Sequence, residues 1–138
     1  GVDSVKLLKE INKQAKKNGR TMDCLLQFHI ANEQAKFGFS RKEAFDFLES
    51  VDFQLFKNIR IVGVMGMATY TDDEKQIGDE FSSLKNYFTE IKEKHIQDNS
   101  FKEISMGMSG DYKIAIEKGS SMIRLGSSIF GIRFQSKF

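Results

Sequence analysis

Residues 105–131 read S-M-G-M-S-G-D-Y-K-I-A-I-E-K-G-S-S-M-I-R-L-G-S-S-I-F-G, and this stretch decides the fold. It predicts a strand over residues 103–108, a helix over 110–118 that ends at Gly119, and a second buried strand over 122–130. A strand, a helix and a further parallel strand form a βαβ unit. The carboxyl ends of both strands then lie at the same end of the sheet.

Two features of this stretch are typical of an anion site. Ser109 stands at the start of the predicted helix, and Gly126 and Ser127 form a Gly-Ser turn just past M-I-R-L at 122–125, inside the span of the predicted last strand. Backbone N–H groups at such turns and helix starts have no partner within the element, and the helix dipole adds partial positive charge. We therefore predict that the two turns converge on a phosphate or sulfate anion. A plain helix N-cap remains the alternative role for Ser109.

Working outward, helical and strand patterns alternate along the chain. We predict a helix between Ser4 and Asn18, a strand over 23–30, a helix after Ser40, a strand over 59–68 and a long helix after Thr71. With the elements above, the order is α-βα-βα-βα-β. This order predicts an α/β domain with a parallel sheet and right-handed crossovers.

Two of the predicted helices begin with the spacing of a capping box. Ser40 precedes Glu43 by three positions, and Thr71 precedes Glu74 in the same way. The apolar positions that follow recur at helical spacing and predict core-facing stripes. The expected buried residues are Ala44, Phe45, Leu48 and Val51 in the first of these helices, and Ile77, Phe81, Leu84, Phe88 and Ile91 in the second.

Composition bounds the class of protein. The 138 residues suit one domain over 1–138. The net charge is only +2, and Lys and Arg are scattered among Asp and Glu, so we expect no nucleic-acid partner. No apolar run reaches the length of about 18 residues that a membrane span needs. The single cysteine, Cys24, lies in an apolar run, so we expect it to be buried and the protein to be cytoplasmic. Thirteen Phe with no Trp indicate much apolar surface that needs cover.

Five segments, in this order, carry a resemblance to a known family. They are V-D-S-V-K-L-L at 2–8, L-L-Q-F-H-I-A-N-E-Q-A-K-F-G-F at 25–39, G-V-M-G-M-A-T-Y-T-D-D at 63–73, S-M-G-M-S-G-D-Y at 105–112 and I-R-L-G-S-S-I-F-G at 123–131. The chain resembles the YggS/PROSC family of pyridoxal phosphate homeostasis proteins, which is related to the barrel domain of alanine racemase. The resemblance implies the second half of a (βα)8 TIM barrel, with pyridoxal 5′-phosphate at the carboxyl ends of the strands.

The resemblance also implies roles for individual residues. Ser109 would hydrogen-bond the cofactor phosphate, and Gly126 and Ser127 would offer it backbone N–H groups. The Ser127 hydroxyl would be a further donor. Arg124 would lie against the pyridine nitrogen, keeping it unprotonated and weakening the ring as an electron sink. A salt bridge to an acid across the barrel is the alternative role for Arg124.

Two methionines complete the implied cofactor site. Met65 and Met67 would line the pocket at a neighbouring strand end without taking part in chemistry. No cluster of histidines or carboxylates has the spacing of metal ligands, so we expect no metal.

The first, second and third barrel strands of the family pattern have no counterpart here. Family members hold the cofactor aldehyde as a Schiff base on a lysine of the first barrel strand, and that strand is not in this sequence. Lys36 does not take its place; we interpret it as a loop residue in ionic contact with Glu33 or another acid. The chain is then expected to be a fragment, an engineered piece or one partner of an assembly. Its half-barrel would be completed by a second copy in a homodimer, or rearranged into an open sheet.

Three functions follow, and they belong to different classes. The preferred one is a noncatalytic cofactor-binding protein that lacks its Schiff-base lysine and binds through the phosphate. The second is an engineered or truncated half-barrel scaffold without activity. The third and least favoured is a racemase-type enzyme, which needs a lysine base and a second acid/base group. We therefore expect a protein that is not an enzyme.

Overall fold

A four-stranded parallel sheet forms the centre of the molecule. The computed structural model describes residues 1–33 and 37–131. The strands pair in their order along the chain, and they are β1 (Met22–Phe28), β2 (Ile59–Gly66), β3 (Glu103–Met108) and β4 (Met122–Arg124). A doubly wound sheet would reverse its strand order, whereas consecutive order is that of a barrel segment. The predicted α/β class and parallel pairing are confirmed.

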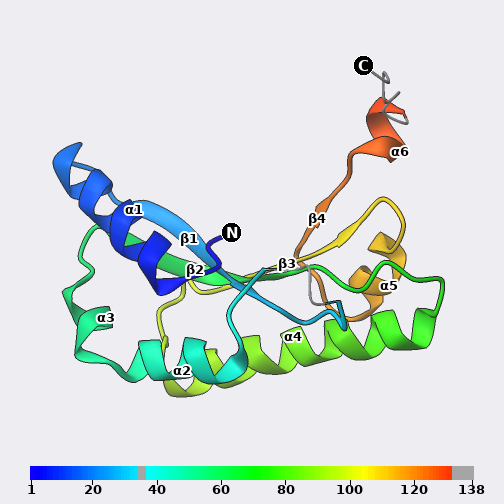
Figure 1. The fold of residues 1–138 in the computed structure, drawn as a ribbon, viewed down its shortest axis with the longest axis horizontal. Helices are drawn as coiled ribbons and strands as arrows, with labels where there is room; N and C mark the ends of the chain where they lie inside the picture. The colour runs from blue at the N-terminus through cyan, green and yellow to red at the C-terminus, as the bar shows by residue number, and fades with distance from the viewer. Residues whose placement is uncertain (34–36, 132–138) are drawn as a thin grey trace.

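The helices connect and cover these strands. They are α1 (Val5–Lys17), α2 (Arg41–Glu49), α3 (Val51–Leu55), α4 (Glu74–Lys94), α5 (Tyr112–Glu117) and α6 (Ser127–Phe130). Figure 1 shows α2, α4 and α5 along one face of the sheet, with α1 beside β1 and α6 beyond the end of β4. The sheet therefore has one face under helices and one face turned away from them.

The outer edge of β1 is not bare. The amide of Val2 donates to the Leu25 carbonyl at 2.9 Å, and the amide of Gln27 donates to the Val2 carbonyl at 2.9 Å. Further along the same strand, Phe28 forms a parallel bridge with Phe39. These short pairings occupy part of the outer edge of β1.

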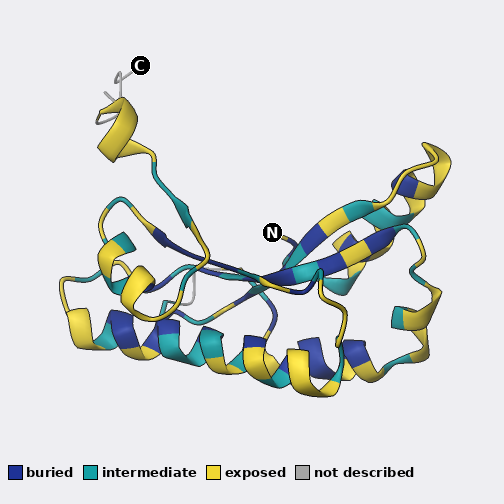
Figure 2. Ribbon diagram, turned by 180° about the vertical axis from the view of Figure 1, so that it is seen from behind, coloured by how far each residue is buried: buried dark blue, intermediate teal, exposed yellow. Residues whose placement is uncertain are grey.

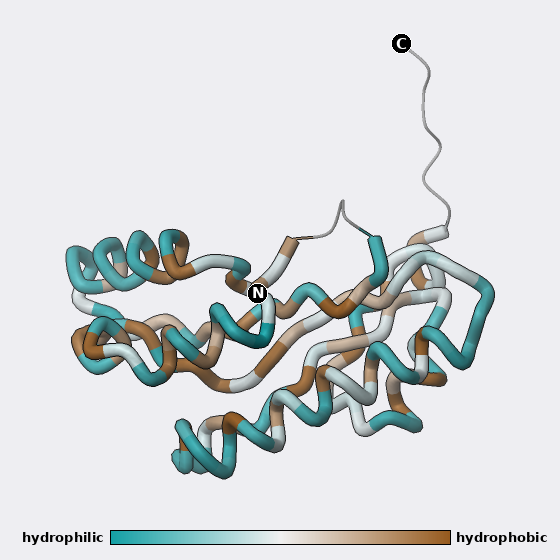
Figure 3. Tube along the Cα trace, turned by 60° about the horizontal axis from the view of Figure 1, so that its bottom comes forward, coloured by the Kyte–Doolittle hydropathy of each residue, from teal (hydrophilic) through white to brown (hydrophobic). Residues whose placement is uncertain are grey.

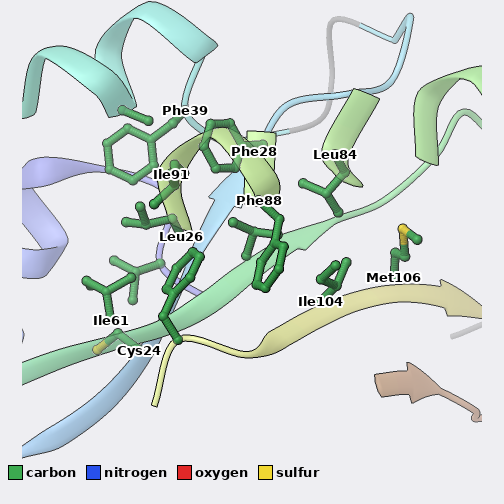
Figure 4. Close-up of a cluster of buried hydrophobic side chains, with 14 of the residues drawn as sticks. Cys24, Leu26, Phe28, Phe39, Ile61, Leu84, Phe88, Ile91, Ile104 and Met106 are labelled. Carbon is green, nitrogen blue, oxygen red and sulfur yellow. The ribbon is translucent and has the colours of Figure 1, made fainter. Parts of the chain in front are cut away.

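The core lies between the sheet and α4. Figure 4 shows Leu84, Phe88 and Ile91 of α4 packed against side chains of the three longer strands. The predicted stripe is confirmed, and its members are Ile77, Phe81, Leu84, Phe88 and Ile91. Seven of the phenylalanines within the described residues are buried, namely Phe28, Phe39, Phe45, Phe47, Phe81, Phe88 and Phe101. The high Phe content thus contributes strongly to the core.

Burial and hydropathy follow the same division. Figure 2 shows buried positions along the sheet and on the inner sides of the helices, and exposed positions on their outer sides. Figure 3 shows the strands as largely hydrophobic and the helices as a mixture of hydrophobic and hydrophilic residues within each turn. This is the pattern of amphipathic helices that cover a buried sheet.

The first two helix starts agree with the sequence prediction. The Ser4 hydroxyl accepts from the amide of Leu7 and caps α1. Ser40 and Glu43 form the predicted capping box, because each side chain accepts from the backbone amide of the other residue. The burial of Ala44, Phe45 and Leu48 is confirmed as well.

Two details of the helix predictions are wrong. Asp73, not Thr71, is the N-cap of α4, since its carboxylate accepts from the amide of Gln76. The Thr71 hydroxyl accepts from the amide of Asp73, two residues ahead, and so stabilises the turn before the helix. Val51 is 73% exposed, because α2 ends at Glu49 and Val51 opens the separate helix α3.

The end of the chain differs most from prediction. The last strand stops at Arg124 instead of extending over 122–130, and residues 127–130 form α6. Ile129 is 65% exposed and Phe130 is 85% exposed, so this segment is not a buried strand. Helix α5 is also shorter than the predicted 110–118, because residues 108–111 form a turn closed by the amide of Asp111 and the carbonyl of Met108.

Candidate functional site

Two turns meet at the carboxyl ends of β3 and β4. The Ser109 hydroxyl oxygen accepts from the amide nitrogens of Gly126 and Ser128, each at 3.2 Å. Ser109 follows β3, and the two amides follow β4, so the parallel pairing of these strands brings them together. The predicted meeting of the two turns is confirmed. The binding roles of Ser109, Gly126 and Ser127 stay predictions.

Ser109 does not cap the helix after it. The N-cap position of α5 is Asp111, and the Asp111 carboxylate accepts from the amide of Met108 at 2.6 Å. This turn carries the Ser109 side chain away from α5 and towards the turn after β4. The alternative role of Ser109 as a helix N-cap is therefore wrong.

The amides at the second turn include one that the sequence analysis missed. Gly126 and Ser128 donate to Ser109, whereas Ser127 lies between them as the first residue of α6. A Cβ atom placed on Gly126 would have no heavy atom within 4 Å apart from those of Gly126 and its two chain neighbours. The turn therefore presents backbone donors beside open space, and the run of two serines after a glycine was the only signal for Ser128.

Arg124 lies at the end of β4 and reaches across the sheet. Its Nη1 donates to the Ser105 hydroxyl at 2.8 Å, and its Nη2 donates to the Gly66 carbonyl at 3.1 Å. Within the described residues it forms no ion pair, so the structure does not support the salt-bridge alternative. Burial lowers the pKa of the Arg124 guanidinium, and the charge of Asp111 acts in the opposite direction. Arginine still remains cationic at neutral pH.

The two methionines lie near this end of the neighbouring strand. Met65 is half-buried near the end of β2, where it pairs in register with Ser105 of β3. Met67 is half-buried just after the same strand. Both are therefore at the strand end where the sequence placed them, and their role in lining a cofactor pocket stays a prediction.

A buried carboxylate at the same end of the sheet was missed by sequence reasoning. Glu80 of α4 is 9% exposed, and it accepts from the amide and the hydroxyl of Thr69, each at 2.7 Å. It also accepts from the amide of Asn32 at 3.3 Å and from the side chain of Gln76 at 3.0 Å. Burial acts to raise the pKa of Glu80, but these hydrogen bonds outweigh it, and the pKa lies below its usual value. Glu80 thus joins the loops that follow β1 and β2.

The remaining candidates have plain structural settings. Cys24 is buried in β1, as predicted, and burial raises the pKa of its thiol. The Glu33 carboxylate accepts from the amide of Tyr70. Lys36, the predicted ionic partner of Glu33, lies outside the described residues.

The described ranges 1–33 and 37–131 contain neither a metal cluster nor a membrane-spanning helix. Within them, no group of three His, Cys, Asp or Glu side chains is arranged to hold a metal ion. No helix of this part of the chain is both long and apolar enough to cross a membrane.

Curated proteins with one shared name match most of this chain. The pyridoxal phosphate homeostasis protein of Helicobacter pylori is 33% identical over 129 residues, which cover 94% of this chain and 54% of that protein. The human protein of the same name is 32% identical, over 99% of this chain and 50% of its own length. The chain thus spans about half the length of these curated relatives.

The fold comparison gives the same result. The structure of PipY from Synechococcus elongatus with pyridoxal phosphate bound superposes with a TM-score of 0.82 at 25% identity. The match covers 94% of this chain and 58% of PipY. The family described as alanine racemase, N-terminal domain, matches residues 1–134. From its sequence, its parallel sheet and these relatives, the chain belongs to the alanine racemase N-terminal domain family, within which it resembles the pyridoxal phosphate homeostasis proteins.

Proposed function

We propose that this chain supplies the phosphate- and ring-binding part of a noncatalytic, pyridoxal phosphate-binding homeostasis protein. The observation that carries the proposal is the pair of amides, Gly126 and Ser128, aimed at one oxygen atom of Ser109. Two donors that converge on one oxygen form a cradle for an anionic oxygen. Hydrogen bonds to a charged acceptor are stronger than those to a hydroxyl, so a phosphate can replace Ser109 as their acceptor.

The donor set fits a phosphate monoester. Once the amides turn to a phosphate oxygen, the Ser109 hydroxyl is released to act as a further donor. Gly126 leaves open space at the turn, and Arg124 provides a cation two residues before it. Ser127, next to both amides, would add its own amide and hydroxyl. The name of PipY's solved complex and the names of the relatives support pyridoxal phosphate as the ligand.

The rest of the ligand would lie over the strand ends. When bound, the cofactor supplies an electrophilic aldehyde and a pyridine ring that can accept electrons. Arg124 would face the ring nitrogen, and its fixed positive charge would disfavour protonation there. Met65 and Met67 would border the ring and keep water from it. These residues bind and orient; none of them is assigned a proton-transfer step.

The noncatalytic role is favoured by the relatives, whose names describe homeostasis. The family fold also occurs in racemases, and a scaffold without activity is the other alternative. Racemase turnover by this chain would contradict the proposal. We also propose that a second copy completes the barrel, and sedimentation velocity would detect the dimer; a strictly monomeric species would contradict this part alone.

The binding proposal is tested by amide NMR. Pyridoxine 5′-phosphate serves as the probe, since it has no aldehyde to react with surface lysines. We expect the amide signals of Gly126, Ser127 and Ser128 to shift with this probe and with inorganic phosphate. Pyridoxine without phosphate, at equal concentration, should leave them in place. Unmoved signals at millimolar pyridoxine 5′-phosphate would overturn the proposed function.

A further inference from the structure

Ser105 is a polar residue in the interior of the sheet. It lies in the middle of β3, and its side chain and backbone together are 1% exposed. A hydroxyl removed from water is costly unless it is hydrogen-bonded. Its described side-chain partner is Nη1 of Arg124, at 2.8 Å. The hydrogen bond from the Arg124 guanidinium therefore offsets the cost of burying the Ser105 hydroxyl. An apolar residue could fill the same space but could not accept this bond.

The guanidinium has a second fixed point on the next strand. The β2–β3 pairing ends at Met65 and Ser105, so the Gly66 carbonyl lies just past the last paired position. Nη2 of Arg124 donates to that carbonyl at 3.1 Å. A planar guanidinium held by two of its nitrogens to two different strands has a fixed orientation. It crosses β3 and joins β4 to β2.

Both acceptors are uncharged. A carboxylate in the place of Ser105 would neutralise the guanidinium and hold it bidentately. A hydroxyl and a carbonyl hold it through one bond each and leave its charge in place. An arginine side chain has five N–H donors, and the two bonds use two of them. The remaining donors and the full charge are available to a ligand at the strand ends.

We propose that Ser105 is a positioning residue, which orients Arg124 so that its remaining N–H donors face the unprotonated ring nitrogen of a pyridoxal-type ligand. This inference rests on the proposed function and adds a residue to it. Ser105 does not touch the ligand. It acts through Arg124, and it selects for ligands whose ring nitrogen accepts a hydrogen bond. A ligand with only a phosphate would not depend on it.

The test compares Ser105→Ala with the wild type, using two ligands. The protonation of the ring nitrogen of bound pyridoxine 5′-phosphate is followed by ultraviolet absorption as the pH is lowered. Loss of the oriented guanidinium should raise the proton affinity of that nitrogen by about tenfold, which is one pH unit. The affinity for inorganic phosphate should stay within about twofold, since the phosphate cradle keeps its charge-assisted donors.

Two further variants separate positioning from a structural effect. Ser105→Thr keeps the hydroxyl and should restore the wild-type titration of the ring. Ser82→Ala removes a hydroxyl that donates to the Gly78 carbonyl within α4, and it should leave both ligands unaffected. If Ser105→Ala does not fold, Ser105→Cys takes its place, because a thiol of similar size is a weak acceptor. In Ser105→Cys, the ring nitrogen of bound pyridoxine 5′-phosphate should take up its proton at a pH between the wild-type value and one about one pH unit higher.

A ligand-free measurement completes the design. NMR of the Arg124 guanidinium should show slow rotation about its Cζ–Nε bond in the wild type and in Ser105→Thr, and faster rotation in Ser105→Ala. Equal guanidinium rotation in the wild type and Ser105→Ala would overturn this inference and leave the proposed function standing. Equal ring titrations in the two proteins, with phosphate binding intact, would do the same. A wild type that binds neither phosphate nor the probe would overturn the proposed function, and the ring-facing role with it.

Discussion

The Ser109 hydroxyl oxygen and the Gly126 amide nitrogen lie 3.2 Å apart, although 17 positions separate these residues in the chain. This contact joins the turn after β3 to the turn after β4. Because the pairing between these two strands is short, the side-chain bond fixes where the second turn lies. The position of the amides in the proposed phosphate cradle thus depends on one hydroxyl.

Replacing that hydroxyl should weaken phosphate binding. Ser109→Ala removes the bond between the two turns and one donor to the anion, so the affinity for inorganic phosphate should fall by about tenfold. Titration of the Gly126 and Ser128 amide signals would measure the change. Ser83→Ala, which removes a hydroxyl bonded to the Asp79 carbonyl within α4, is the control and should bind like the wild type. Equal affinities of all three proteins would show that Ser109 contributes nothing.

A glycine in β2 should not tolerate a side chain. A Cβ atom on Gly63 would overlap the backbone carbonyl group of Glu103 in the paired strand β3. The two strands would have to separate, and we expect Gly63→Ala to lower the free energy of unfolding by about 3 kcal/mol or more. Urea denaturation would measure this. Gly110→Ala is the matched control, since a Cβ there has no neighbour within 4 Å. A loss below about 1 kcal/mol for Gly63→Ala would contradict the close approach of the strands.

The start of α4 offers a direct test of which residue caps it. Asp73→Ala removes the side chain that accepts from the Gln76 amide, and it should cost about 1 kcal/mol of stability. Thr71→Ala removes only a bond within the preceding turn and should cost about half as much or less. Both are read from denaturant unfolding. The reverse order of the two losses would favour the capping box predicted from the sequence.

Glu80 should make stability depend on pH in the acid range. Its pKa in the folded state lies below the ordinary value of 4.5, so it contributes stability above that value. This contribution is lost as the pH falls below 4.5 and through the lower folded-state pKa, because the unfolded chain binds the proton first.

Two variants would isolate this contribution. Glu80→Gln should lower stability at pH 7 by about 1 to 3 kcal/mol, because an amide cannot accept all the hydrogen bonds made to the carboxylate. It should also flatten the pH dependence of unfolding below pH 4.5. The exposed Glu93→Gln is the control, with an expected change within about 0.5 kcal/mol. An unchanged acid profile in Glu80→Gln would argue against the buried network.

Sequence periodicity was sufficient for most of the fold. The apolar stripe of α4 and the boundaries of β3 could be read directly, because core burial imposes a regular spacing on both. The end of the last strand could not, since Ile129 and Phe130 after the Gly-Ser turn are as apolar as Met122 and Ile123 before it. The Gly126-Ser127 turn ends it at Arg124, and an exposed helix follows. Apolar content alone does not distinguish a buried strand from an exposed helical turn.

The candidate site was only partly predictable for a different reason. Ser109 and Gly126 could be placed together from the βαβ pattern, which fixes the end of the sheet where each turn lies. Ser105, Ser128 and Glu80 could not, because their roles depend on side-chain bonds between elements far apart in the chain. A serine inside an apolar strand and a glutamate on a helix stripe were the available signals.

The reach of Arg124 across β3 has a thermodynamic consequence. Strand β4 has only three residues, and the guanidinium of its Arg124 bonds it to β2 as well as to β3. A ligand that accepts a hydrogen bond from the same guanidinium would change the free energy with which β4 packs against the sheet. Occupancy and local order are then linked, and by reciprocity each changes the other by the same factor. The hydrogen-exchange rates of the Met122 and Arg124 amides would therefore measure ligand occupancy without a signal from the ligand itself.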